Sequence, residues 1–416
     1  MDFGMTNETI DKNGPVVVVG AGQAGFSVCA KLRDLGHVGP ITLVGNEAQP
    51  PYQRPPLSKG YLLGDITEER LFLRPLAFYE QKAIQLRLGA QVEAIDRQRR
   101  SVLLSDRSVL PYSHLVLATG SRPRVLDQEQ GGDLEGVYYV RSIADTKKMA
   151  PEFKAGRHVL VVGGGYIGLE AAAVSSKLGL RVTLIESAPR ILQRVASVQT
   201  ASFFQQLHRS HGVEICEGVE LAMLTGRDGR VTQAHMKDGR AFDVDFVIVG
   251  IGIHPNVELA QAAGLEIDNG IKVDAQCWTS DPTILAAGDC ASFPWKGRRI
   301  RLESVGNSID QGEAVAKTIT LASECYTAKP WFWSDQFDIK LQIVGLAAGH
   351  DSAVMRKISE TALSIWHYRG DELLAVDAIN QPAVFMVSKR LIEAGRSPDP
   401  KAVSDMSIDL KSLLGT

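Results

Sequence analysis

Two stretches of the chain carry the glycine fingerprint of a dinucleotide-binding βαβ unit, and this constrains the fold more than any other feature. The second copy, residues 158–186, runs from an apolar strand (VLVV) into Gly163, Gly165 and Gly168. It continues as an alanine-rich helix and ends on Glu186. The first glycine makes a tight turn, the second lets backbone N–H groups approach a pyrophosphate, and the third lets the helix pack on the strand. The helix N-terminus adds partial positive charge, so a bound dinucleotide is predicted.

The first copy, residues 16–47, has the same order of elements, with Gly20, Gly22 and Gly25 as its fingerprint. An internal repeat of this kind predicts two nucleotide domains and two bound dinucleotides. The fold class is therefore α/β, with two Rossmann-like domains.

The acid that ends the second copy is displaced in the first. Aligning ITLVGNE on VTLIE puts Gly45 where the second copy has Glu186. The ribose contact then falls either to Glu47 or to Asn46 as a neutral partner. The sequence leaves both open.

Three further segments predict parts of a ligand site. Residues 50–62 contain four prolines, which make a stiff loop in which Arg54 and Lys59 are candidates to touch the pyrophosphate or the ring system of a bound cofactor. Strand-like HLVLATG ends on Thr119 and Gly120, and ILAAGD ends on Asp289. Ligands of α/β proteins bind at such carboxyl ends of strands, although the acid is also suited to capping a helix.

The order of elements predicts that the second nucleotide domain is inserted into the first. Residues 121–157 are polar and are expected to be connective, and residues 197–212 to form an amphipathic helix. Hairpins are predicted within residues 213–245, and a polar helix over 308–319. The expected domains are 1–121 with 253–328, then 122–252, and finally a C-terminal α+β domain, 329–416, whose tail after Pro382 is expected to be helical and polar.

Composition excludes several functional classes. The 416 residues carry 45 Lys and Arg against 48 Asp and Glu, a net charge of −3 that does not favour nucleic acid or an anionic membrane. No apolar run is long enough for a membrane helix, and the polar N-terminus does not read as a signal peptide, so the cytoplasm is the expected location. The five cysteines form no CxxC pair, which argues against disulfides, a metal site or a chain-borne iron–sulfur cluster.

Seven motifs taken in order make the chain recognisable. They resemble the motifs of oxygenase-coupled, NADH-dependent ferredoxin reductases, the putidaredoxin reductase type of the glutathione reductase superfamily. The seven motifs are GAGQAG, PYQRPPLSK, LVLATGSRPR, VVGGGYIGLE, VIVGIGIHPN, AAGDCA and PWFWSDQ. The resemblance implies FAD on the first domain, NADH on the second, and a third domain that shields the flavin and presents it to a [2Fe-2S] ferredoxin. That ferredoxin would feed a terminal oxygenase such as a haem-thiolate monooxygenase. Residues 50–62 hold no cysteine, which removes the thiol chemistry of the disulfide reductases.

The resemblance also implies roles for individual residues. Lys59 and Glu170 are expected to form a catalytic pair near the nicotinamide, with Glu170 on the first turn of the helix in the second copy. The remaining expected contacts to NADH are Gly163, Gly165, Ile167, Gly168, Glu186 and Gly252. Those to FAD are Gly20, Gly22, Ala24, Gly25, Asn46, Glu47, Arg54, Lys59, Val92, Thr119, Gly120, Arg141, Asp289, Val305 and Trp333.

Specificity and partner binding lead to two further expectations. Glu186 favours NADH because a carboxylate binds the ribose 2′-OH and repels a 2′-phosphate, with Arg190 the one feature that opposes this preference. The basic run Lys296, Arg298, Arg299 and Arg301 is a candidate surface for an acidic ferredoxin. Whether Trp331 or Trp333 covers the flavin stays open. The alternatives are a rubredoxin reductase and a redox-sensing interaction protein like apoptosis-inducing factor.

Overall fold

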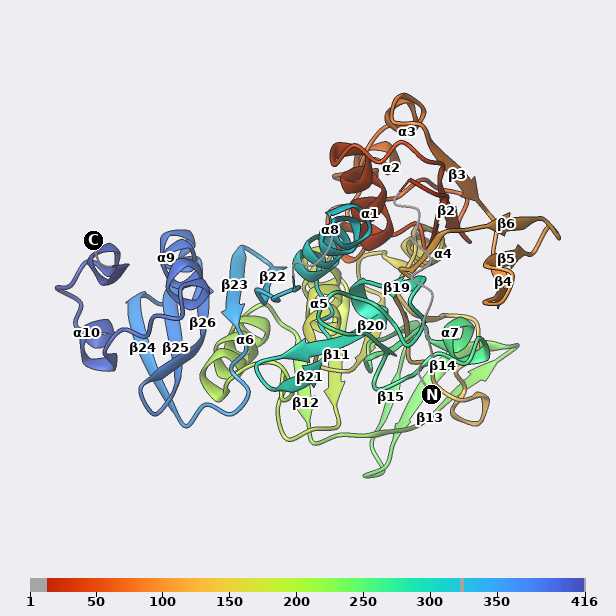
Figure 1. Ribbon diagram of the computed structural model, residues 1–416. Helices are drawn as coiled ribbons and strands as arrows, with labels where there is room; N and C mark the ends of the chain where they lie inside the picture. The colour runs from red at the N-terminus through yellow and green to blue at the C-terminus, as the bar shows by residue number, and fades with distance from the viewer. Residues whose placement is uncertain (1–12, 322–324, 415–416) are drawn as a thin grey trace. The chain divides into compact units, whose positions relative to one another are not determined.

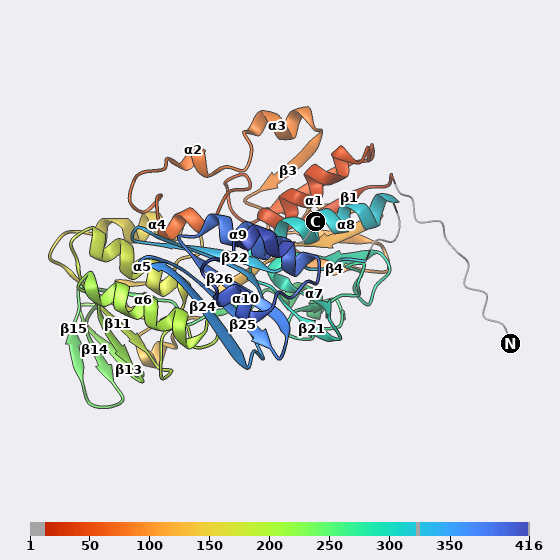
Figure 2. The same cartoon turned by 90° about the vertical axis from the view of Figure 1, so that its left-hand side faces the viewer.

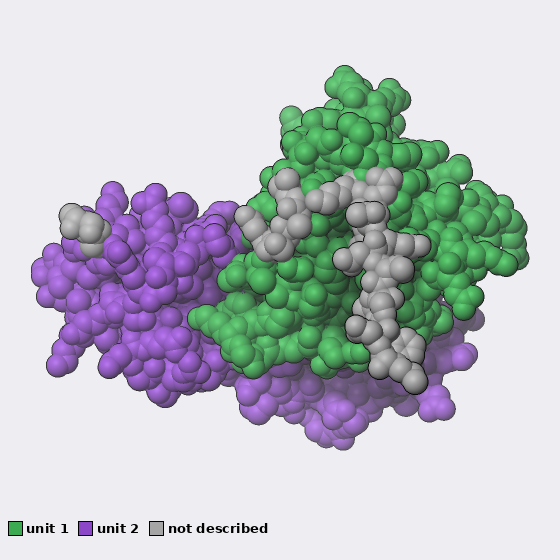
Figure 3. Space-filling model, viewed as in Figure 1, with its two compact units in different colours: residues 1–53, 69–122, 255–328 green, residues 54–68, 123–254, 329–416 purple. Residues whose placement is uncertain are grey.

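A computed structural model describes residues 13–321 and 325–414, which divide into two compact units (Figure 3). Unit 1 is drawn from residues 1–53, 69–122 and 255–328, and unit 2 from 54–68, 123–254 and 329–416. The chain thus passes between units close to the two places expected for the insertion. The predicted three-domain division stays a prediction, because compactness does not say which cofactor a unit holds.

Unit 1 is built on a parallel five-stranded sheet buried on both faces. Val16 and Val18 face a cluster that includes helices α1 and α8, which pack side by side (Figure 1). Val17 and Val19 face the opposite cluster, which includes the small sheets β4–β5–β6 and β18–β20–β21. Burial on both sides explains the unbroken apolar run VVVV. In sheet order the strands are β19(Ile284–Ala286), β7(His114–Leu117), β1(Val16–Val19), β2(Ile41–Gly45) and β3(Ile84–Leu88), and the two helices are α1(Gln23–Asp34) and α8(Val305–Leu321).

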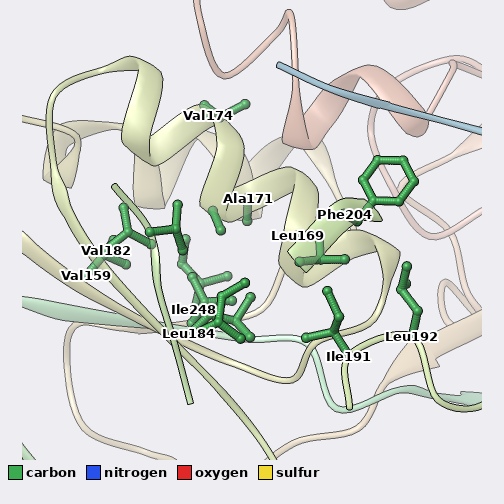
Figure 4. Close-up of a cluster of buried hydrophobic side chains, with 14 of the residues drawn as sticks. Val159, Leu169, Ala171, Val174, Val182, Leu184, Ile191, Leu192, Phe204 and Ile248 are labelled. Atoms are coloured by element: carbon green, nitrogen blue, oxygen red, sulfur yellow. The ribbon is translucent and has the colours of Figure 1, made fainter. Parts of the chain in front are cut away.

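Unit 2 repeats this design. Leu169 and Ala171 of helix α5 pack on Val182, Leu184 and other buried side chains, together with Phe204 of α6 (Figure 4). The opposite face of the sheet packs on the small sheet β13–β14–β15. In sheet order the strands are β12(Glu214–Glu217), β11(Arg181–Glu186), β10(His158–Val162), β16(Phe246–Val249) and β9(Val137–Tyr138), and the two helices are α5(Tyr166–Lys177) and α6(Val198–Ser210). The two parallel sheets confirm the predicted α/β class.

The C-terminal part of unit 2 is an antiparallel five-stranded sheet with helix α9 packed on it (Figure 2). Arg356 of this sheet donates hydrogen bonds to the carbonyls of Val403, Asp405, Met406 and Ile408, and so anchors the tail. In sheet order the strands are β22(Trp331–Gln336), β23(Ile339–Gly345), β26(Glu372–Ile379), β25(Ala362–Arg369) and β24(Ser352–Ser359), followed by α9(Pro382–Glu393), α10(Pro400–Ser404) and the 3₁₀ turn η5(Leu410–Leu414).

Three expectations about elements need correction. The connective segment 121–157 contains helix α4(Ile143–Met149), which Ser142 and Asp145 start as a reciprocal capping box. Within 213–245, β12 is not a hairpin strand but pairs in parallel with β11. Helix α9 is amphipathic instead of polar, because its side chains Val384, Phe385, Val387 and Leu391 are buried.

The remaining elements are short. Within the described ranges 13–321 and 325–414, no helix has both the length and the apolar character needed to cross a bilayer. The small sheets and boundary strands are β4(Val92–Asp96), β5(Ser101–Leu104), β6(Val109–Pro111), β8(Ser121–Pro123), β13(Leu221–Arg227), β14(Arg230–Met236), β15(Ala241–Asp243), β17(Ile253–Pro255), β18(Ile271–Lys272), β20(Ala291–Trp295) and β21(Arg298–Ile300). The short helices and turns are η1(Pro55–Ser58), α2(Glu68–Leu71), α3(Leu76–Gln81), η2(Gln128–Gln130), η3(Ala150–Glu152), α7(Glu258–Ala262) and η4(Gly288–Cys290).

Candidate cofactor-binding and active site

The first fingerprint forms an open helix N-terminus in unit 1. Gly20 has φ +115°, and a Cβ on it would lie 2.1 Å from the Ala118 carbonyl oxygen. A Cβ on Gly25 would lie 2.0 Å from the Gly20 carbonyl oxygen, so only glycine lets α1 pack this closely. A Cβ on Gly22 would meet nothing within 4 Å, and no side chain caps the helix there. The backbone N–H groups that begin α1 thus have no side-chain cap, an arrangement that suits the predicted binding of a pyrophosphate.

The second fingerprint has the same geometry in unit 2. Gly163 has φ +105°, and a Cβ on Gly168 would lie 2.0 Å from its carbonyl oxygen. Gly165 is open, like its counterpart in unit 1, and it begins α5 without a side-chain cap. Ile167, on the first turn, is 46% exposed. The start of α5 therefore also suits the predicted binding of a pyrophosphate, and this role stays a prediction.

At one contact between the glycine-rich turn and the neighbouring strand, the two copies differ in which of the two residues is a glycine. In unit 2, Glu186 Oε2 accepts a hydrogen bond of 2.7 Å from Gly164 N, and a Cβ on Gly164 would lie 3.2 Å from Glu186 Cβ. In unit 1 the corresponding residues are Ala21 and Gly45, and a Cβ on Gly45 would lie 2.5 Å from Ala21 Cβ. The side chain of Ala21 takes the space that a side chain at Gly45 would need, so the alanine in GAG excludes an acid at Gly45.

The displaced acid of unit 1 is already engaged within the protein. Glu47 Oε2 accepts a hydrogen bond of 2.6 Å from the buried Tyr52 hydroxyl, whereas Asn46 is exposed. This arrangement favours Asn46 as the group presented to a ribose, and both assignments stay predictions.

Glu186 is held rigidly at the end of β11. Its Oε1 accepts a hydrogen bond of 2.7 Å from Ala188 N, while its Oε2 accepts the bond from Gly164 N. Arg190, which was expected to oppose a preference for NADH, donates instead to the carbonyls of Ile191, Gln193, Ala196 and Ser197. Its guanidinium stabilises the loop, so it is not positioned as a receptor for a 2′-phosphate.

Replacing Glu186 by alanine is expected to lower kcat/KM for NADH by about tenfold and to leave the value for NADPH within about threefold, because both a ribose acceptor and a repulsive charge are removed. Steady-state kinetics with both nucleotides measure this change. Glu217→Gln, at a carboxylate that accepts from Ile191 N and Gln205 instead, is the matched control. An unchanged ratio in Glu186→Ala would contradict the assignment.

Two of the other expected FAD residues of unit 1, Thr119 and Asp289, follow parallel strands. Thr119, after β7, exchanges hydrogen bonds of 2.7 and 2.8 Å with Asn256. Asp289, after β19, accepts 2.9 Å from the Ser121 hydroxyl. The other residues of this set are Gly120, with φ +67°, Ala24 and Val92, which are buried, and Val305, the first residue of α8.

The expected catalytic pair is formed within unit 2. Lys59 Nζ lies 2.9 Å from Glu170 Oε1, and their side chains are 18% and 6% exposed. Helix α5 begins at Tyr166, so Glu170 lies in its second turn and not in the first as expected. The proline-rich loop is thus joined to α5, and Arg54 of the same loop donates a hydrogen bond of 2.7 Å to the carbonyl of Arg141.

Two hydroxyls that sequence reasoning missed complete the environment of Glu170. Ser334 Oγ donates 2.7 Å to Oε1, and Ser58 Oγ donates 3.2 Å to Oε2. Burial raises the pKa of Glu170, while Lys59 and the two hydroxyls act in the opposite direction. Ser58 is adjacent to Lys59 in the sequence, but only the fold brings Ser334 to this helix.

Comparison with known proteins shows full-length relatives. The pyridine nucleotide-disulphide oxidoreductase family model matches residues 14–312, and a reductase C-terminal model matches 331–414. Putidaredoxin reductase of Pseudomonas putida is 41% identical over 413 residues, 97% of this chain and 98% of the relative. The chain belongs to the pyridine nucleotide-disulphide oxidoreductase family. Within it, the predicted resemblance to ferredoxin reductases that use FAD and NAD(H) is confirmed.

Solved structures agree with this assignment. The reductase in a covalent putidaredoxin reductase–putidaredoxin complex superposes with a TM-score of 0.94 at 41% identity, covering 97% of this chain and 98% of that chain. A ferredoxin reductase from Rhodopseudomonas palustris gives 0.94 at 40% identity, covering 96% and 100%. The α/β fold with an added C-terminal domain is therefore common to this reductase and its relatives.

The aromatic run of the reductase is divided between the two faces of β22. Phe332 packs against Tyr166 of α5, with ring centroids 4.6 Å apart and ring planes tilted by 35°. On the other face Trp331 and Trp333 stack at 5.5 Å, and Trp331 also contacts Phe385 of α9. Trp331 thus packs into the C-terminal core, and which of the two tryptophans covers a flavin stays open.

The basic run of the reductase lies at the hairpin between β20 and β21. Arg299 donates to the Val273 carbonyl, and Arg301 pairs with Glu303 at 2.7 Å. Lys296 and Arg298 are exposed and lie over the Trp295 ring at 5.1 and 5.5 Å. We define Trp295, Lys296 and Arg298 as the basic hairpin tip.

The last predicted nucleotide contact lies where the parallel sheet of unit 2 ends. Gly252 has φ +108°, and a Cβ on it would approach the side chains of Arg194 and Arg124 to 3.5 and 3.7 Å. Two cationic side chains thus lie beside this glycine, a suitable environment for an anionic ligand.

Proposed function

We propose that this chain is an NADH-dependent ferredoxin reductase of the cytoplasm, which carries FAD and passes electrons to a [2Fe-2S] ferredoxin that serves an oxygenase. The observation that carries the proposal is the repeated open helix N-terminus, one in each unit, where two dinucleotides can bind. Putidaredoxin reductase, a full-length relative, has been crystallised in a covalent complex with putidaredoxin.

The residues of unit 1 fit the adenine half and the ribityl chain of FAD. Gly22 leaves space at the N-terminus of α1 for a pyrophosphate, and Asn46 is exposed at the end of β2 for a ribose. Asp289 already accepts a hydroxyl hydrogen bond from Ser121, the interaction that a ribityl hydroxyl would make. FAD binding therefore requires no new type of contact from these side chains.

Unit 2 would hold NADH, and its side chains would orient the nicotinamide. Glu186 would accept hydrogen bonds from the ribose, and Gly165 would leave space for the pyrophosphate. When bound, FAD supplies the chemistry that accepts a hydride and releases its two electrons singly. Lys59 and Glu170 would hold the nicotinamide amide and exclude water from the region around it.

Ferredoxin reduction tests the proposal directly. Purified reductase with NADH is expected to reduce a [2Fe-2S] ferredoxin in many rapid turnovers, which cluster absorbance would follow. A panel that also holds a rubredoxin separates the nearest alternative. Slow turnover with all acceptors, together with a long-lived charge-transfer complex with NADH, would contradict the proposal and favour a redox-sensing interaction protein.

Ferredoxin binding is expected to weaken with salt, because the basic hairpin tip presents exposed cations to an acidic partner. Arg298→Glu should raise KM for ferredoxin by about fivefold or more at low ionic strength and leave KM for NADH unchanged. Steady-state assays at several salt concentrations measure both values. Arg227→Glu, at an exposed arginine of β13, is the control. Salt-independent KM values in the wild type would exclude electrostatic docking.

A further inference from the structure

A continuous chain of buried polar side chains leads from Glu170 to helix α6. Ser334 Oγ lies 2.7 Å from Glu170 Oε1, Gln336 Nε2 lies 3.1 Å from Ser334 Oγ, and His208 Nε2 lies 2.8 Å from Gln336 Oε1. Ser334, Gln336 and His208 are each 0% exposed, and Glu170 is 5% exposed. Hydrogen bonds at such depth are strengthened by the low local dielectric.

Side chains alternate between the two faces of β22, and this places Ser334 and Gln336 on the same face. Ser334 and Gln336 are two residues apart, so both side chains point the same way, as does Phe332, which packs against Tyr166. That face contacts α5, and Gln336 on it contacts His208 of α6, whereas Trp331 and Trp333 lie on the other face. The strand that carries the tryptophans thus also supports the carboxylate.

Each bond in the chain has its donor on the side away from Glu170. The Gln336 carbonyl oxygen can only accept, so His208 must carry its proton on Nε2. The Gln336 amide then donates to Ser334, and the Ser334 hydroxyl donates to Glu170. Hydrogen bonds that all donate in the same direction polarise one another. Because all three donate toward Glu170, they favour its negatively charged form.

His208 stays neutral and so keeps this tautomer. Burial lowers the pKa of His208 to about 4, although the bond to Gln336 raises it, and nearby His211 lowers it further. Among the described residues, Lys59 and the buried Tyr166 hydroxyl are also near Glu170, and the pKa of Tyr166 is raised well above its usual value by burial, then by Asp377 and Glu170. Lys59 brings positive charge to the carboxylate, and the hydroxyls of Ser58 and Ser334 add hydrogen bonds to it.

We propose that Ser334, Gln336 and His208 are positioning residues, a relay of donors that orients Glu170 toward Lys59 and keeps it ionised. None of the three needs to touch a cofactor. This inference rests on the proposed role of Glu170 beside the nicotinamide. The relay would make the C-terminal domain part of the hydride-transfer site, beyond any part it has in contacting the ferredoxin.

Removing donors one at a time tests the relay. Ser334→Ala should raise the pKa of Glu170, because a hydrogen bond to the charged form is lost. Flavin reduction by NADH, followed by stopped flow, should then reach half its maximum rate at a pH about one unit higher. Gln336→Leu should give a smaller shift of the same sign. Ser334→Thr, which keeps the hydroxyl, should restore the wild-type profile.

A readout independent of turnover accompanies the kinetics. Infrared difference spectra of the holoprotein, recorded across pH, should show the band of the protonated Glu170 carboxyl. The band is identified by its absence in Glu170→Gln. In Ser334→Ala it should persist to higher pH than in the wild type. The matched control is Ser364→Ala, which removes another buried serine of the same sheet. The hydroxyl of Ser364 accepts a hydrogen bond from Trp366 Nε1. This variant should leave the band unchanged.

The outcomes separate the relay from the function on which it rests. If Glu170→Gln slows flavin reduction but Ser334→Ala moves neither the band nor the pH profile, the relay is wrong and the role of Glu170 stands. If Glu170→Gln leaves flavin reduction unchanged, the proposed role of Glu170 fails, while the band still reports whether Ser334 supports its ionised form. Equal band shifts in Ser334→Ala and Ser364→Ala would reduce the effect to loosened packing and overturn the relay.

Discussion

Gly25→Ala is expected to yield a protein that no longer retains FAD, whereas Gly168→Ala should stay yellow and lose affinity for NADH. The two substitutions are equivalent, because each new Cβ would lie 2.0 Å from the carbonyl oxygen of the first fingerprint glycine, Gly20 or Gly163. Backbone cannot yield as a flexible side chain does, so each helix must move away from its strand. The anion site at the helix N-terminus is lost in one unit only.

Flavin absorbance after gel filtration measures the first effect, and the KM for NADH measures the second, which we expect to rise about tenfold or more. Gly22→Ala is the informative control, because its Cβ meets no protein atom within 4 Å. It should leave thermal stability unchanged and weaken FAD binding through the space it takes from the pyrophosphate. Loss of FAD in Gly168→Ala with retention in Gly25→Ala would reverse the assignment of cofactors.

Local signals allowed the two nucleotide units to be predicted, because a fingerprint records backbone geometry directly. The displaced acid was visible in the sequence, but its reason was not. Ala21 takes the space that a side chain at Gly45 would need, whereas Gly164 leaves its N–H open to the Glu186 carboxylate, and these contacts are seen only when the turn lies against the neighbouring strand. Helix α4 could have been predicted, since Ser142 and Asp145 have the spacing of a capping box.

The environment of Glu170 was beyond local signals. Its partner Lys59 was expected from resemblance alone, and Ser334 and His208 are brought near it by strand β22 and helix α6, which are remote in the sequence. The alternation of WFWSDQ does separate Ser334 and Gln336 from the tryptophans, which predicts a shared face but not the helix that covers it. Long-range packing of this kind leaves no periodic pattern to read.

The Lys59–Glu170 pair should show strong non-additivity. Lys59→Met and Glu170→Gln are each expected to slow flavin reduction by NADH about tenfold to a hundredfold, and the double variant should be no slower than the worse single variant, because the two groups act as a unit. Lys59→Met should also destabilise the protein by about 3 kcal/mol, since it leaves a buried carboxylate without its cation. The double variant should recover much of that stability.

Stopped-flow kinetics measure the rate of flavin reduction, and urea unfolding measures stability. Both are applied to the wild type, the two single variants and the double variant, which together form a double-mutant cycle. Lys31→Met, which breaks the more exposed pair of Lys31 with Glu313 at 3.0 Å, should cost at most about 1 kcal/mol and leave the rate unchanged. The sign of the pH dependence is a further check. Because burial raises the pKa of Glu170 and Lys59 opposes that rise, Lys59→Met should raise the pKa further, so that its residual rate increases with pH over a range where the wild type is already at its plateau. Additive rates in the cycle would mean that the two residues act separately, with Lys59 contributing to flavin binding and Glu170 to the nicotinamide.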